Sequence, residues 1–71
     1  MKGVKYNCII DDSTSIQNMD MKTIVIKINE ILNEKYNGLL TVNSNKIYNL
    51  INRPKLASKN LKKILKVEYV T

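Results

Sequence analysis

The chain has 71 residues, one cysteine, no histidine and a formal net charge of +6. This length predicts one small basic domain over residues 1–71, with a thin hydrophobic core. The absence of histidine excludes Ser–His and Cys–His nucleophile pairs and the usual zinc ligand sets within one chain, so we expect no enzymatic activity, metal or cofactor.

The first half of the chain predicts a strand, a loop and a helix. Residues 4–10 alternate apolar and polar side chains, which favours a strand, and the polar residues 11–18 predict a loop. Residues 21–36 predict a helix, because apolar residues recur at every third or fourth position after the potential N-cap Asp20. The many β-branched residues leave a strand over residues 23–27 as the alternative.

The second half predicts two shorter helices. Residues 39–42 are apolar and fit a brief strand or a packed connector. A second helix is expected over residues 45–52, since proline disfavours helical dihedrals in the residue before it, and a third over residues 59–66. Residues 67–71 are strand-like. The inward faces of the two helices are predicted to contain Ile47, Leu50, Ile51, Leu61, Ile64 and Leu65.

These elements predict an α+β, mostly helical fold in the order β-α-α-α-β, with the two short terminal strands paired. The second and third helices follow the order of a helix-turn-helix unit, whose later helix enters the DNA major groove. Residues 43–67 resemble small phage helix-turn-helix proteins in this general pattern. The turn, residues 53–57, is five residues long and contains proline, so we expect a different crossing angle.

The basic residues are concentrated in the second half. Residues 1–34 carry a net charge of −1 and residues 35–71 a net charge of +7, with no acidic residue between Lys35 and Val67. Such a one-signed surface attracts polyanions, of which nucleic acid is the commonest in a cell. On the predicted third helix one face carries four lysines without an interleaved carboxylate: Lys59, Lys62, Lys63 and Lys66. We expect this stripe to contact phosphates, the alternative being a solvated face.

Four residues on the second helix and the following turn complete the candidate site. Asn49 could bond an adenine edge or donate to a phosphate oxygen. Arg53 is the only arginine, and its planar fork suits bidentate contact with a phosphate. Lys46 and Lys55 add positive charge. The predicted nucleic-acid-binding residues are thus Lys46, Asn49, Arg53, Lys55, Lys59, Lys62, Lys63 and Lys66.

The sequence gives less support to base stacking, to metal binding and to a reactive cysteine. The four tyrosines are dispersed and predict no base-stacking platform on a strand, and Tyr48 is expected to be half-buried at the edge of the second helix. The neighbouring Asp11 and Asp12 could hold Mg²⁺, but the other carboxylates are scattered along the sequence, so we do not expect a nuclease. The lone Cys8 fits a small apolar position on a strand in a reducing compartment.

The leading prediction is a small, non-enzymatic DNA-binding protein in the cytoplasm, acting in transcription regulation as a homodimer on duplex DNA. Lysine, asparagine and isoleucine make up 31 of the 71 residues, which is typical of an AT-rich bacterial, phage or other viral genome. The alternative is a small viral effector that binds a host or rival nucleic-acid-handling protein complex and inhibits or redirects it. An RNA-binding role is a third option. No apolar run approaches the ~20 residues of a membrane span, and residues 1–10 lack the apolar core of a signal peptide.

Overall fold

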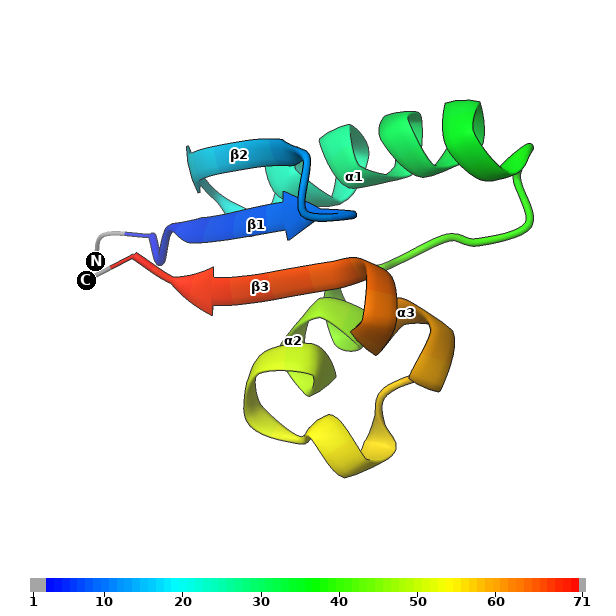
Figure 1. Ribbon diagram of the computed structural model, residues 1–71. Coiled ribbons are helices and arrows are strands. Elements are labelled where there is room, and N and C mark those ends of the chain that lie inside the picture. Colours follow the sequence, from blue (N-terminus) through cyan, green and yellow to red (C-terminus); the bar gives the residue numbers. More distant parts are fainter. Residues whose placement is uncertain (1–2, 71) are drawn as a thin grey trace.

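The computed structural model describes residues 3–70 and contains three helices and a three-stranded antiparallel sheet (Figure 1). The order is β-β-α-α-α-β rather than the predicted β-α-α-α-β, because one strand was not anticipated. The protein is a small α+β structure. Its elements are β1 (Tyr6–Ile10), β2 (Thr14–Met19), α1 (Met21–Tyr36), α2 (Ser44–Asn52), the 3₁₀ turn η1 (Pro54–Leu56), α3 (Lys59–Ile64) and β3 (Leu65–Tyr69).

The additional strand is β2, so the prediction of a loop over residues 11–18 is wrong. A tight turn reverses the chain between β1 and β2, and the Ser13 N–H donates to the Ile10 carbonyl at 3.0 Å. Asp11 and Asp12 have φ angles of 52° and 57°. Two successive positive φ values are uncommon outside glycine, and aspartate is one of the residue types that adopts them most readily. The turn was missed because it contains no glycine.

The sheet has the order β2-β1-β3, with β1 in the centre. β1 and β3 run antiparallel, with Tyr6 opposite Tyr69 and Ile10 opposite Leu65. This pairing confirms that the strands near the two chain ends lie together. Beyond the last strand pair, the Val70 N–H donates to the Lys5 carbonyl at 3.0 Å.

The predicted helix over residues 21–36 is confirmed as α1, and the alternative strand over residues 23–27 is wrong. The Asp20 carboxylate accepts a hydrogen bond from the Thr23 N–H at 2.8 Å and caps the first turn. The helix ends at Asn37, whose φ of 53° is left-handed. Three residues on its inner face are buried at helical spacing: Ile24, Ile28 and Leu32. Their packing against the core stabilises the helix in spite of its many β-branched residues.

The connector between α1 and α2 is not a strand, and it is packed only in part, since Leu40 contacts the core but Leu39 is 83% exposed. Val42 is buried, and its backbone is held by the side chain of Asn29. Asn29 donates to the Val42 carbonyl at 2.9 Å and accepts from the Val42 N–H at 2.8 Å. This paired bond fixes the start of α2 against α1.

The third helix is shorter than predicted, since α3 ends at Ile64 and the chain continues directly into β3. Lys66 therefore lies on a strand. The alternation of buried Leu65 with exposed Lys66 along β3 shows that sheet pairing with β1 prevails over the lysine-rich helical pattern. In Figure 1, α2, η1 and α3 lie together beside β3, and α1 lies on the β2 side of the sheet.

One hydrophobic core joins the two helical parts to the sheet. The residues predicted to face inward do so, because Ile47, Leu61 and Leu65 are buried and the other three are half-buried, although Leu65 lies on β3 and not on α3. The buried core consists of Cys8, Ile10, Ile16, Ile24, Ile28, Leu32, Val42, Ile47, Leu61 and Leu65.

Candidate nucleic-acid interface

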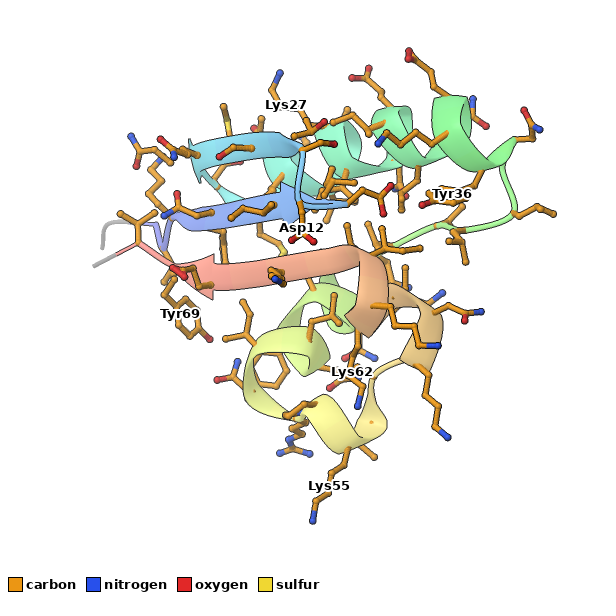
Figure 2. All side chains as sticks on the ribbon, viewed as in Figure 1. Asp12, Lys27, Tyr36, Lys55, Lys62 and Tyr69 are labelled. Carbon is orange, nitrogen blue, oxygen red and sulfur yellow. The ribbon has the colours of Figure 1, made fainter. Side chains whose placement is uncertain are left out.

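Five of the predicted site residues form what we call the cationic lobe, which extends from the end of α2 to the end of α3. All five are exposed, and within residues 3–70 none of them forms an ion pair. Figure 2 shows Lys55 and Lys62 on this lobe, whereas Lys27 of α1 extends from the opposite side of the molecule. The cationic lobe consists of Arg53, Lys55, Lys59, Lys62 and Lys63.

The local sequence explains how these cations come to share one lobe. Pro54 ends α2 and begins η1, in which the Leu56 N–H donates to the Arg53 carbonyl at 2.9 Å. The Ser58 hydroxyl then accepts from the Leu61 N–H at 3.5 Å and starts α3. The chain therefore bends twice within eleven residues. The five cations come from three short consecutive segments rather than from one long helix.

Within α3, Lys59 precedes Lys62 and Lys63 by three and four residues, so the three ammonium groups share one helix face. Like charges at these spacings repel by roughly 0.2–0.5 kcal/mol per pair. No carboxylate of the described residues relieves this repulsion. An anionic partner would relieve it.

Lys66, the fourth member of the predicted stripe, does not belong to the lobe. It lies on β3 opposite Ile9, and its Nζ is 3.2 Å from an Asp12 carboxylate oxygen. Lys35 forms a second ion pair, with Asp11, also at 3.2 Å. The hairpin turn between β1 and β2 thus pairs with two of the eight basic residues between Lys35 and Val67.

Lys46 and Asn49 lie on α2, outside the lobe. Lys46 is exposed in the first turn of the helix, and its Nζ is 3.4 Å from the Thr41 carbonyl. It lies about 10 Å from Arg53 along the helix axis. Asn49 is half-buried, and its carbonyl accepts from the Arg53 N–H at 2.9 Å. These two residues are less favourably placed for a shared ligand than the five of the lobe.

The structure brings two of the tyrosines that the sequence suggested were dispersed into ring contact, and a side-chain amide connects a third to them. The rings of Tyr6 and Tyr69 face each other across β1 and β3, with centroids 5.5 Å apart. The Asn52 side-chain amide donates to the Tyr69 hydroxyl at 2.7 Å and to the backbone carbonyl of Tyr48, one helical turn earlier, at 3.3 Å. Tyr48 is 45% exposed. We refer to Tyr6, Tyr48 and Tyr69 as the tyrosine cluster.

The strand register is the signal that could have revealed this cluster. Pairing of the terminal strands was predicted without a register, and only the observed register places Tyr6 opposite Tyr69. The third member comes from α2, which packs against β3. No sequence spacing links Tyr48 to Tyr69, because the Asn52 hydrogen bond that joins α2 to Tyr69 depends on that tertiary contact.

The neighbouring aspartates at the hairpin turn have separate structural partners. Asp11 accepts hydrogen bonds from the Tyr36 hydroxyl at 2.8 Å and from Lys35, and these contacts lower the pKa of its carboxyl group, the Tyr36 bond having the largest effect. Asp12 instead meets Lys66. Within the described part of the chain, no three His, Cys, Asp or Glu side chains gather as a metal site would require. Asp11 therefore attaches the hairpin to the end of α1.

Cys8 is fully buried in the centre of the sheet. Burial raises the pKa of its thiol to about 12, so the thiol is protonated at neutral pH. A buried, protonated thiol packs as a small apolar group and is not positioned as a nucleophile.

Comparison of the chain with family models, curated proteins and solved structures found no match. None of the helices within residues 3–70 combines the length and the apolar character needed to cross a membrane.

Proposed function

We propose that the protein is a non-enzymatic nucleic-acid-binding protein and that its cationic lobe contacts the phosphates of duplex DNA. The observation that carries this proposal is the placement of five exposed cations within eleven residues, without an ion pair among the described residues. Phosphate contacts would replace the repulsion among these cations with attraction and would release counterions from the DNA.

The form of the lobe favours phosphate contact over base readout. α3 has six residues and is about 9 Å long, so it offers little length for reading several base edges in a groove. Arg53 and Lys55 lie before it on the bend, where they would contact phosphates beside those bound by α3. The helix-turn-helix order remains part of the proposal, with α3 docked along the groove edge. A homodimer would double the number of contacts.

The test is the salt dependence of binding to random-sequence duplex DNA. If the lobe neutralises five phosphates, log K should fall with log salt with a slope of about −4.5, or about 500-fold between 50 and 200 mM salt. Fluorescence anisotropy with labelled duplex measures both values, and excess structured RNA as competitor reveals an RNA preference.

A different result would favour the alternative function, in which the protein binds another protein. If the protein fails to bind duplex DNA and RNA at 50 mM salt but forms a stoichiometric complex with a nucleic-acid-handling protein in a pull-down, the nucleic-acid proposal is wrong. The lysines would then meet carboxylates of a protein partner, as expected of a small viral effector.

A further inference from the structure

The tyrosine cluster lies where the end of β3 meets the last turn of α2. Tyr69 is the labelled side chain at this end of β3 in Figure 2. Asn52, the last residue of α2, donates to its hydroxyl at 2.7 Å. Two elements that are distant in the sequence therefore meet at one surface.

Both outer tyrosines of the cluster are accessible. Tyr48 is 45% exposed and Tyr69 is 39% exposed. Tyr48 and Asn52 are four residues apart on α2 and therefore share a helix face, and the Asn52 amide on that face reaches Tyr69. The hydroxyl of Tyr69 therefore lies on the side of α2 that carries Tyr48.

The ring of Tyr69 is held in place on two sides. Tyr6 packs against it with an interplanar angle of 39°, and the Asn52 amide binds its hydroxyl. Asn52 uses its side-chain nitrogen for both Tyr69 and the Tyr48 carbonyl. A ring that is already ordered loses little conformational freedom when a flat ligand stacks on it.

The tyrosine cluster adjoins the cationic lobe. Arg53 directly follows Asn52, and Lys55 lies two residues further on. A backbone phosphate bound by Arg53 would therefore place its own nucleotide beside the cluster. Aromatic side chains next to a positively charged groove are the usual means by which proteins bind single strands.

We infer that the tyrosine cluster stacks an unpaired nucleotide base next to the phosphates bound by the cationic lobe, so that the protein prefers single-stranded nucleic acid to a duplex of equal length. This inference rests on the phosphate contacts proposed for the cationic lobe, and it adds that an unpaired strand binds more tightly than the duplex because it offers a base to stack. Bases inside a duplex have both faces covered by their neighbours, whereas an unpaired base offers a free face to Tyr48 or Tyr69.

The experiment compares two double variants with the wild-type protein. Tyr48→Leu with Tyr69→Leu keeps apolar bulk but removes both aromatic faces, whereas Tyr48→Phe with Tyr69→Phe keeps the faces and removes only the hydroxyls. The ligands are labelled 15-nucleotide dT, 15-nucleotide rU and a 15-base-pair duplex at 50 mM salt, measured by anisotropy. Circular dichroism melting confirms folding, and the single variant Tyr48→Leu serves if the leucine pair does not fold.

Loss of stacking should weaken single-strand binding by about 5–150-fold per base in the leucine pair, with duplex binding unchanged and the phenylalanine pair close to the wild type. The oligonucleotide, dT or rU, whose affinity falls in the leucine pair shows whether the stacked base belongs to DNA or to RNA. The inference is overturned if the leucine pair binds single strands as tightly as the wild type, or if the phenylalanine pair loses as much affinity as the leucine pair. In either case salt-dependent binding of the duplex would leave the proposed function standing, whereas absence of binding to all three ligands would refute both.

Discussion

Neutralising the three lysines of α3 provides a quantitative test of the cationic lobe. The triple variant Lys59→Gln, Lys62→Gln and Lys63→Gln removes three of its five charges. Glutamine has nearly the helix propensity of lysine and all three positions are exposed, so the fold should be preserved.

The expected size of the effect follows from counterion release. Reducing the phosphate contacts from five to two changes the log–log salt slope from about −4.5 to about −1.8. If these contacts contribute nothing at 1 M salt, the variant loses affinity about 3,000-fold at 50 mM and about 80-fold at 200 mM. Anisotropy titrations with labelled DNA at four salt concentrations measure the slope directly.

The chain offers a control with the same change in net charge. Lys5, Lys22 and Lys27 are exposed lysines of the first half of the sequence, and Figure 2 shows Lys27 on the opposite side of the molecule from Lys55. Their triple replacement by glutamine should leave the slope near its wild-type value. Equal losses of slope in the two triple variants would show that net charge, and not the lobe, determines binding.

Four further predictions concern the fold. Burial and the raised pKa of about 12 should make alkylation of Cys8 by iodoacetamide at pH 8 at least about 1,000-fold slower in the native than in the urea-unfolded protein; similar rates would contradict its core position. Leu61→Ala should cost about 2–4 kcal/mol in urea unfolding, because Leu61 is buried between α3 and the sheet, and an unchanged midpoint would refute that packing. Asp12→Gly should raise the melting temperature by about 2–4 °C, since glycine adopts the positive φ without strain and the exposed Lys66 ion pair contributes little; a lower melting temperature would argue against the turn geometry. Because the folded pKa of Asp11 is lowered, its charge contributes stability above about pH 4 that is lost as the pH falls through the folded pKa, so Asp11→Asn should flatten the acid dependence of stability in melts between pH 2 and 6, and an unaltered acid profile would exclude this contribution.

Local patterns predicted the parts of the fold that local physics determines. α1 has a capping aspartate and regular apolar spacing, so both its position and its buried face were predictable. The boundaries of α2 were also predictable, because Asn43 caps its start and proline follows Arg53 at its end. The charge asymmetry likewise indicated where the cations of the lobe would gather.

The features that were missed depend on tertiary contacts. The hairpin turn contains two aspartates with positive φ in place of the usual glycine-containing pair, so the polar residues that include β2 were interpreted as a loop. α3 stops at Ile64 because the next residues complete the sheet, which removed Lys66 from the expected stripe. The tyrosine cluster needs both a strand register and the packing of α2 against β3, and neither is encoded in residue spacing.

The acidic hairpin turn gives the molecule an electric dipole. Asp11 and Asp12 pair with Lys35 and Lys66, so five of the other six cations of the second half belong to the cationic lobe, while the first half carries a net charge of −1. The electric field of a polyanion exerts a torque on such a dipole. The torque orients the cationic lobe toward the polyanion before contact, which raises the fraction of encounters that lead to binding. If the lobe binds a nucleic acid as proposed, β2 and α1 would face away from it and would present a nearly neutral surface.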